Sequence, residues 1–279
     1  MTETMNQARY VFLEEMAAAQ INGELAPEML DPKEIITDIK HFLLDTVYMS
    51  LGGDEVRFID QLSLWIYGTY FYREFADGFP YLLIQGEAGT GKTTIAEAVA
   101  ALAFNAKHAE HMTENALLRS MNSRRNGTFI FDDSSTLFDE KEDYKLEEIL
   151  KAGYRDDASY WRIDEEKDVP RQFSAFSPKV ICRTKPIDPV IEDRCIKIIT
   201  RRATSEQLMA QEDIKDRDVL VKAGTLKMRM MLSTFLNAPI VRVMKQNQDD
   251  KPIYALRNNL IQKPLAVMAR LVDEHYAIR

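Results

Sequence analysis

Residues 81–94 read Tyr-Leu-Leu-Ile-Gln-Gly-Glu-Ala-Gly-Thr-Gly-Lys-Thr-Thr. The first four are apolar, as in a buried strand, and the stretch from Ile95 to Ala103 has the composition of a helix. Between them, residues 86–93 match the pattern G-x-x-x-x-G-K-[ST] in full. A strand, a glycine-rich turn and a helix, in this order, are the context in which the pattern forms a phosphate-binding loop, or P-loop.

The residue types in this loop fit a phosphate ligand. Glycines let the backbone turn its N–H groups inward around an anion, and the N-terminus of the next helix favours negative charge. Lys92 is expected to reach the β and γ phosphates of ATP, and the Thr93 hydroxyl to bind Mg²⁺. The residues expected to hold the nucleotide are Gly86, Glu87, Ala88, Gly89, Thr90, Gly91, Lys92, Thr93 and Thr94.

A second apolar strand, Thr128 to Phe131, ends in Asp132 and Asp133. Such a strand is the usual second half of a P-loop ATPase site. Asp132 is predicted to hold the Mg²⁺ shell, and Asp133 to orient or deprotonate the attacking water. Asp132 lies 40 residues beyond Lys92, which leaves room for another helix and strand. A further strand can therefore lie between these two in the sheet.

The stretch from Lys179 to Thr184 reads as a third strand that ends in polar groups. A polar residue at such a strand end can lie between the two acids and the γ-phosphate. Thr184 is the candidate for this sensing role, and Arg183 is the alternative.

Arg194 precedes a strand predicted over Ile196 to Thr200. An arginine that a neighbouring subunit inserts into an ATP site stabilises the charge that develops on the transferred phosphoryl group. The other interpretation is a surface ion pair with Asp193 or Glu192. Spacing alone does not separate the two.

Residues 160–164 and 173–176 are expected to form a hairpin with a polar tip. One hypothesis is that this hairpin projects into a central pore, with Arg162 and Lys167 near a strand of nucleic acid. The aromatic residues between Trp65 and Phe75 could stack on the bases of a nucleic acid. The favoured interpretation is that their helix packs against the core.

Four further stretches resemble a known group of proteins. They are Trp65-Ile66-Tyr67-Gly68-Thr69-Tyr70, Glu114-Asn115-Ala116-Leu117-Leu118-Arg119, Ile149-Leu150-Lys151-Ala152-Gly153-Tyr154-Arg155 and Asp193-Arg194-Cys195-Ile196. With the nucleotide motifs, they resemble the AAA+-like ATPase modules of phage, plasmid and mobile-element proteins, often called primase-associated or helicase-like. The similarity spans roughly residues 60–202.

The resemblance implies an α/β core, ATP with Mg²⁺, a ring-shaped homo-oligomer, and an arginine finger at Arg194, which favours that interpretation over the ion pair. Two positions depart from the family. Asp133 stands where the family has Glu. The Asp side chain is shorter, and this argues against fast hydrolysis. The expected Asn after the sensor strand is absent, which leaves Arg183 or Thr184.

The expected fold class is therefore α/β, with a P-loop NTPase core of the AAA+ or RecA-like type and a parallel sheet. A helical N-terminal region is expected over residues 1–79, the ATPase core over 80–202, and a helical C-terminal lid over 203–279. Helices are expected over about 4–21, 31–51, 55–75, 204–216, 219–236 and 264–276. Pro239 is expected to stop the fifth of these, and Arg229 is a candidate lid arginine.

Composition limits the classes of function. An apolar fraction of 46% in 279 residues is enough for a large core, and the net charge of −8 argues against a surface generally coated by nucleic acid. The two cysteines form no C-x-x-C pair or disulfide framework. Met1 to Arg9 has no apolar signal region, and no apolar run is long enough for a membrane span. The expectation is a cytoplasmic protein, bacterial or in a host cell if viral, with no membrane partner.

Three functions compete. The first is an oligomeric ATPase acting on DNA, with single-stranded DNA as the expected partner. It would be a helicase-like motor or an accessory in replication or recombination of a phage or mobile element. The second is a slow ATPase switch that assembles or recruits a partner protein, for example in defence. The third, a small-molecule kinase, ranks last because no arginine-rich lid follows the core closely.

Overall fold

A computed structural model describes residues 27–48, 55–109, 112–123, 126–132, 143–164, 169–204, 206, 211–249 and 257–277. Asp133, Lys167 and the helix expected over residues 4–21 lie outside the described residues.

The core is a sheet of five parallel strands in the order β2-β3-β6-β1-β7. The strands are β1 (Tyr81–Gln85), β2 (Lys107–His108), β3 (Phe129–Phe131), β6 (Lys179–Arg183) and β7 (Cys195–Ile199). The P-loop strand β1 and the acidic strand β3 are separated by β6, so the prediction of an intervening strand is confirmed. This parallel sheet, flanked by helices, confirms the predicted α/β fold class.

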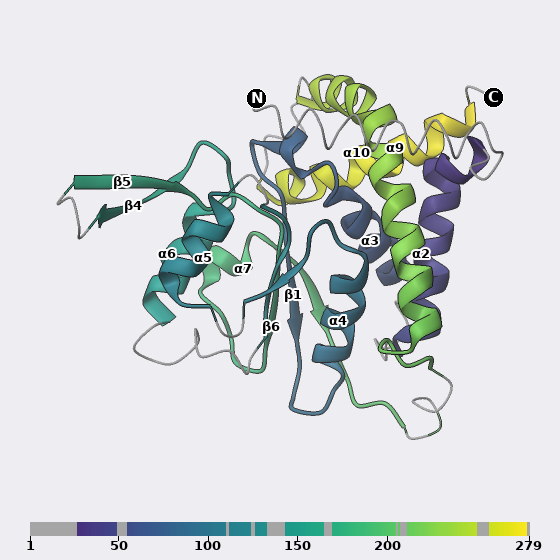
Figure 1. Ribbon diagram of the computed structural model, residues 1–279, viewed down its shortest axis with the longest axis horizontal. Coiled ribbons are helices and arrows are strands. Elements are labelled where there is room, and N and C mark those ends of the chain that lie inside the picture. Colours follow the sequence, from purple (N-terminus) through teal and green to yellow (C-terminus); the bar gives the residue numbers. More distant parts are fainter. Residues whose placement is uncertain are drawn as a thin grey trace.

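The remaining two strands, β4 (Ser159–Asp164) and β5 (Val169–Ser174), pair antiparallel and confirm the predicted hairpin. The returning strand begins at Val169, four residues ahead of the predicted 173–176, and ends at Ser174. Figure 1 shows this hairpin extending away from the body of the molecule on the left. The helices are η1 (Pro27–Leu30), α2 (Pro32–Thr46), α3 (Glu55–Gly68), η2 (Tyr72–Phe75), α4 (Lys92–Leu102), α5 (Glu114–Met121), α6 (Asp143–Ala152), α7 (Pro189–Glu192), α9 (Arg217–Asp249) and α10 (Arg257–Ala277).

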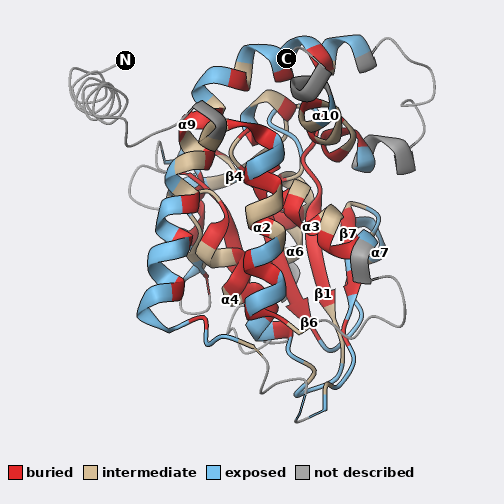
Figure 2. Cartoon of the chain, turned by 90° about the vertical axis from the view of Figure 1, so that its right-hand side faces the viewer, coloured by how far each residue is buried: buried red, intermediate tan, exposed pale blue. Residues whose placement is uncertain are grey.

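Side chains that alternate along β1, β3 and β6 fill two separate cores, one on each face of the sheet. In β1, for example, Leu82 and Ile84 pack into the core beneath α4 and the terminal helices. Tyr81 and Leu83 pack into the core beneath α5 and α6. Figure 2 shows the strands as a buried layer between these helices. Because both faces are covered, the strands read as continuous apolar runs in the sequence.

Helices from the two ends of the chain pack together on one face of the sheet (Figure 1). Contacts join α10 to α2, α3 and α9, and join α9 to α2 and α4. The Tyr67 hydroxyl lies 2.6 Å from that of Ser233, and Lys263 forms a 2.6 Å ion pair with Asp77. The aromatic residues of α3 and η2, such as Trp65 and Phe75, are buried here, which confirms that they pack rather than stack on bases. The boundaries at residues 79 and 202 remain predictions.

Several predicted helix ends were wrong. The third helix ends at Gly68, and a separate 3-10 turn, η2, follows it. Residues 211–216 lie in turns instead of a helix. The last helix starts at residue 257, ahead of Pro264.

Pro239 does not stop α9, which continues to Asp249. A proline inside a helix removes one hydrogen bond and bends the axis. Figure 1 shows α9 changing direction in its second half. Val241 and Met244, which follow the proline, are buried in the core, and this burial offsets the cost of the bend.

A buried lysine organises the carboxyl end of α6. Lys179 is fully buried, and its ammonium group donates to the carbonyl oxygens of Gly153 (3.3 Å), Ala175 (2.8 Å) and Ser177 (3.1 Å). A side chain at Gly153 would lie 2.6 Å from the Lys179 Nζ, which accounts for glycine at this position. The last carbonyl groups of a helix need such donors, and a cation also suits the negative end of the helix dipole.

We expect Lys179 to make stability depend on pH. Burial lowers the pKa of Lys179 well below its ordinary value, so the unfolded chain binds this proton more tightly than the folded chain does. The free energy of unfolding should therefore rise as the pH rises toward the ordinary lysine pKa of about 10. Denaturant unfolding should show that Lys179→Met is less stable than the wild type and lacks this rise. Parallel pH curves for the two proteins would contradict the assignment.

Candidate nucleotide-binding site

The loop between β1 and α4 has the backbone shape of a phosphate cradle. Gly89 and Gly91 have φ angles of 74° and 84°, in the left-handed region that glycine adopts readily. The helix α4 starts at Lys92, three residues earlier than predicted, directly after Gly91. Its unpaired N–H groups therefore begin at the loop itself, where an anion is favoured.

Lys92 folds back over the loop that precedes it. Its Nζ donates to the carbonyl oxygens of Gly86 and Glu87, both at 2.9 Å, and to the Thr184 hydroxyl at 3.2 Å. The side chain is 8% exposed, so these three acceptors satisfy a largely buried cation. The ammonium group is thereby held at the carboxyl ends of β1 and β6.

The two residues predicted to bind Mg²⁺ lie in contact. The Thr93 hydroxyl donates to Asp132 Oδ2 over 2.8 Å, although the two are far apart in sequence. Asp132 follows β3 and is 6% exposed. A hydroxyl and a carboxylate supply the oxygen ligands that Mg²⁺ prefers, so this pair fits the ion.

The two sensor candidates occupy different positions. The Thr184 hydroxyl faces Lys92, whereas Arg183 is largely buried and its carbonyl oxygen accepts from the Gly86 N–H at 3.3 Å. The hydroxyl of Thr184 is therefore the polar group that the end of β6 brings to the P-loop lysine. Which residue acts as sensor remains a prediction.

Thr200, at the end of β7, contacts the P-loop, and no sequence motif predicted this role. Its hydroxyl lies 2.7 Å from that of Thr90, and its N–H donates to the Gln85 carbonyl at 2.8 Å. A Cβ on Gly86 would lie 2.2 Å from the Thr200 hydroxyl oxygen. Only glycine therefore fits at position 86. The pairing of β7 with β1 creates this contact, so it cannot be predicted from a local pattern in the sequence.

Gly86→Ala should weaken ATP binding by about tenfold or more, because the added methyl group must displace Thr200 or the loop. The added methyl group would also lie 2.8 Å from the Thr200 carbonyl oxygen, so it would clash with the backbone as well as with the hydroxyl. Titration with a fluorescent ATP analogue measures the affinity. Gly224→Ala is the matched control, since a Cβ there meets nothing within 4 Å. Equal affinity of the two variants would show that Thr200 does not restrain the loop.

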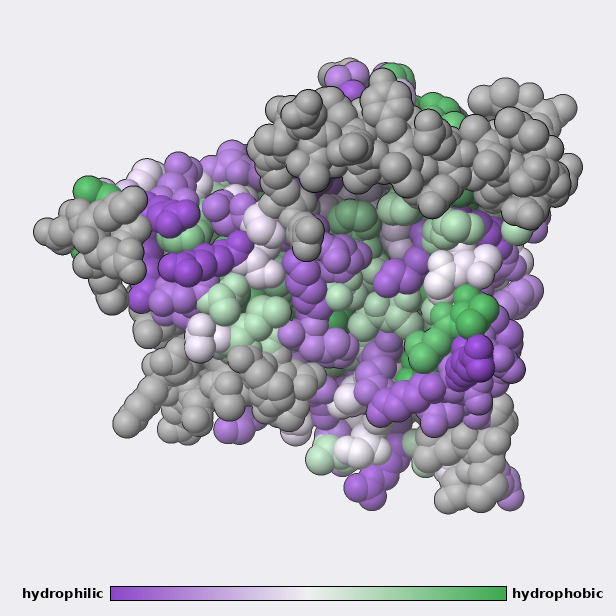
Figure 3. Space-filling view, in the orientation of Figure 1, coloured by the Kyte–Doolittle hydropathy of each residue, from purple (hydrophilic) through white to green (hydrophobic). Residues whose placement is uncertain are grey.

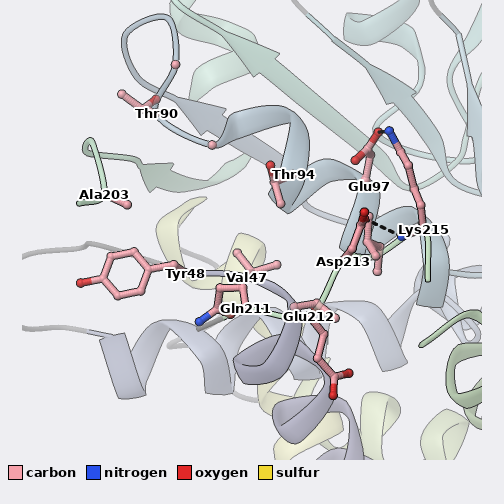
Figure 4. Close-up of a pocket in the computed structure, with 14 residues that line it drawn as sticks. Val47, Tyr48, Thr90, Thr94, Glu97, Ala203, Gln211, Glu212, Asp213 and Lys215 are labelled. Carbon is pink, nitrogen blue, oxygen red and sulfur yellow. Dashed lines mark hydrogen bonds and ion pairs between the residues drawn. The ribbon is translucent and has the colours of Figure 1, made fainter. Parts of the chain in front are cut away.

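A cavity of about 390 Å³ opens beside the P-loop, and three distant segments line it (Figure 4). They are the end of α2 (Thr46, Val47 and Tyr48), the P-loop and α4 (Gly89, Thr90, Gly91, Thr94 and Glu97), and the segments around Ala203 and before α9 (Gln211 to Lys215). The Glu212 N–H donates to the Asp45 carbonyl at 2.7 Å, which fastens the last segment to the first. A cavity of this volume is in the range of small-ligand sites.

Arg202 adds positive charge at the rim of the loop. A Cβ built on Gly89 would lie 3.8 Å from one terminal nitrogen of the Arg202 guanidinium. The side chain is exposed, so this group can turn toward an anion in the loop. The adjacent pair Arg201-Arg202 is visible in the sequence, but its closeness to Gly89 depends on the position of β7.

Arg194 lies at the opposite edge of the sheet from the P-loop. Its carbonyl oxygen accepts from Tyr81 N–H, at the start of β1, whereas the P-loop follows the end of β1. Five strand residues separate the two, or about 16 Å. The guanidinium donates to the Lys151 carbonyl and lies 5.3 Å from the Tyr154 ring centroid. Arg194 therefore cannot complete the site of its own chain.

The hairpin presents apolar side chains to solvent. Trp161 and Ile163 share one face and are 59% and 60% exposed. On the other face, Arg162 lies 3.4 Å from Glu114 of α5. The hypothesis that Arg162 meets nucleic acid is thus weakened, since its charge is already paired within the chain.

Within the described residues, no cluster of three or more His, Cys, Asp or Glu side chains could hold a metal ion. In that same part of the chain, every helix is too short or too polar to cross a membrane.

No protein-family model matches this sequence, and no curated protein matches it. Among solved structures, the chain is similar to an active helicase, Cch of SCCmec type IV, with 12% identity and a TM-score of 0.42 over 85% of this chain and 47% of that one. Two structures of JCV helicase with bound compounds give 15% and 16% identity and TM-scores of 0.35 and 0.34. Those matches cover 94% and 90% of this chain, and 73% and 77% of those chains. The chain thus spans about half the length of the Cch helicase.

Proposed function

We propose that this chain is a Mg²⁺-dependent ATP hydrolase that works as an oligomer. The observation that carries the proposal is that Lys92 and Thr93, which follow β1, meet Asp132, which follows β3, at the carboxyl ends of two parallel strands that flank β6. Mg²⁺, when bound, would supply positive charge that offsets the negative charge of the phosphates. Thr93 and Asp132 would hold this ion, and Lys92 would move from the loop carbonyl groups to the phosphates.

The cavity beside the P-loop would take the nucleoside. Its walls touch the loop at Gly89 to Gly91, so a nucleotide with its phosphates in the loop extends directly into the cavity. Tyr48 offers an aromatic ring for the base, and Arg202 a positive charge for a phosphate. Closure of this cavity by residues 211–215 is the role that we assign to the C-terminal region.

Arg194 would act in the site of a neighbouring subunit. Its position at the edge of the sheet far from its own P-loop supports a role in trans over a role in its own site. A ring of subunits would repeat this contact around a central pore. Arg229, the earlier candidate for a lid arginine, pairs with Asp38 of α2 and is therefore not proposed for the site.

This ATPase would be a helicase-like motor that acts on single-stranded DNA, as the resemblance to mobile-element ATPases implies. The feature of this chain that supports DNA binding is the projecting hairpin with exposed Trp161, since bases stack on aromatic rings. Trp161→Ala should weaken single-stranded DNA binding by about tenfold and leave basal ATP hydrolysis unchanged. Fluorescence anisotropy with a labelled oligonucleotide measures this. Unchanged affinity would remove the hairpin from the proposal.

A second candidate is a slow ATPase switch that recruits a partner protein. The net charge of −8 and the short acid Asp133 favour it. Steady-state ATP hydrolysis with Mg²⁺, with and without single- and double-stranded DNA, separates the two. Stimulation by DNA supports the motor, and a slow rate that DNA does not change supports the switch. No hydrolysis under any condition would contradict both.

A further inference from the structure

One polar atom in the wall of the cavity beside the P-loop is buried without a hydrogen-bond donor. It is Oε1 of Gln211, which accepts no hydrogen bond from any residue that the structure describes. Other polar side chains in this wall already have partners: those of Thr46, Thr90, Glu97 and Glu212. A buried amide oxygen of this kind has lost its hydrogen bond to water and gained none in return. It is therefore suited to a ligand that brings a donor.

Gln211 can present this oxygen to a ligand in the cavity. The terminal torsion of a glutamine side chain turns at low cost, so Oε1 can move toward the cavity that the residue lines. The backbone around it, in contrast, is held in place. The Glu212 N–H donates to the Asp45 carbonyl of α2 at 2.7 Å. On the other side of the cavity, Lys215 pairs with Glu97 of α4 at 3.6 Å.

The ends of two helices give the cavity opposite polarity on its two sides. The helix α4 begins at the loop, and its N-terminal N–H groups favour a phosphate there. The helix α2 ends at Thr46, which lines the cavity, so the negative end of its dipole lies at this wall. Figure 4 shows the two sides, with Thr90 and Thr94 on one and Val47, Tyr48 and Gln211 on the other. A ligand with an anionic end and a hydrogen-bond-donating end therefore fits in one orientation.

The surroundings of the cavity are polar as well. Figure 3 shows largely hydrophilic side chains on the lower part of the molecule, where the P-loop lies, apart from a hydrophobic patch over the first turns of α9. Charged residues in the cavity wall are Glu97, Glu212, Asp213 and Lys215. A charged, hydrogen-bonding ligand such as a nucleotide therefore suits this cavity better than an apolar one.

We propose that Gln211 makes this site selective for adenine, by accepting a hydrogen bond from the amino group at position 6 of the base. The inference rests on the proposed function, because it needs a triphosphate in the P-loop. With the phosphates there, position 6 lies at the end of the base away from the ribose, toward the wall that holds Gln211 and the end of α2.

Guanine is disfavoured in the same position. It carries a carbonyl oxygen where adenine carries the amino group, and this oxygen would face the Gln211 oxygen. A flipped Gln211 amide could donate to that oxygen, but the negative end of α2 would still repel it. The helix end and the glutamine together therefore select the amino group.

Equilibrium binding of two triphosphates that differ in one group tests the proposal. Purine riboside triphosphate has the ring, ribose and phosphates of ATP but lacks the 6-amino group. Competition against an ATP analogue labelled on its ribose, with Mg²⁺ present, measures both affinities. We expect the wild type to bind ATP about tenfold more tightly than purine riboside triphosphate. Gln211→Met keeps the length of the side chain without the amide, and it should bind the two about equally.

Thermal unfolding distinguishes a role in binding from a role in folding. Because Gln211 Oε1 accepts no hydrogen bond from the described residues, Gln211→Met without nucleotide should be at least as stable as the wild type. Saturating ATP should raise the melting temperature of the wild type more than that of this variant. The matched control is Gln61→Met, since Gln61 is a partly buried glutamine of α3 that does not line the cavity. This control should keep the preference for ATP.

Other outcomes overturn the proposal. Equal wild-type affinity for the two triphosphates, or a preference that Gln211→Met retains, would contradict the role of Gln211 and leave ATP binding at the P-loop in place. A lower melting temperature of nucleotide-free Gln211→Met would assign the amide to the fold instead. Binding of neither triphosphate would overturn both this inference and the proposed function.

Discussion

Lys92→Ala is expected to reduce Mg²⁺-dependent ATP hydrolysis on the order of 100-fold or more. The ammonium group lies 2.9 Å from the carbonyl oxygens of Gly86 and Glu87, within reach of any phosphate in the loop. Release of phosphate under steady-state conditions, with saturating ATP and Mg²⁺, measures the effect.

The control for this experiment removes a lysine elsewhere. Lys40→Ala removes a surface ion pair with Asp60 on the helical layer, and it should hydrolyse ATP at the wild-type rate. Thermal unfolding of both variants shows whether they fold, which matters because Lys92 is largely buried. A folded Lys92→Ala protein with the full rate would end the proposal of hydrolysis at this loop.

Arg194→Ala should lower hydrolysis by about 1,000-fold if its charge completes the neighbouring site. The guanidinium also caps α6 through the Lys151 carbonyl, so the variant loses some stability as well. Mixing subunits distinguishes these two effects. A Lys92→Ala subunit retains Arg194, and an Arg194→Ala subunit retains the P-loop lysine, so each repairs the other at some of the shared sites.

The expected result is that an equimolar mixture of the two inactive variants hydrolyses ATP. Arg194→Lys serves as the comparison, since lysine can still donate to the carbonyl group but does not reproduce the planar guanidinium. Arg194→Lys should therefore recover thermal stability without recovering the rate. An inactive mixture, with both variants folded and oligomeric, would assign Arg194 to the structure of α6 alone.

Local chemistry allowed much of this molecule to be read from the sequence. The spacing from Gly86 to Thr93 specifies a turn whose conformation depends on residues that are neighbours in the chain. The strands β1, β3 and β6 were recognisable because both faces of a parallel sheet are buried, which makes each strand a short apolar run. The caps of α2 and α5, Asp31 and Thr113, follow from local hydrogen bonding.

Helix ends were harder to predict. Pro239 is a strong local signal against helix, yet the burial of Val241 and Met244 outweighs it. The low helix propensity of proline costs about 3 kcal/mol inside a helix. Burying two apolar side chains stabilises the folded protein by about as much.

The sequence by itself determined that a P-loop, an acidic strand and a polar strand end exist, because each is a pattern of adjacent residues. Only the tertiary structure decided which of them meet. The order of the sheet brings Thr93 to Asp132 and Lys92 to Thr184, and it moves Arg194 to the far edge. The same order places Thr200 against Gly86. These contacts join residues many positions apart, and strand pairing over the whole sheet, which no local pattern encodes, fixes which ones form.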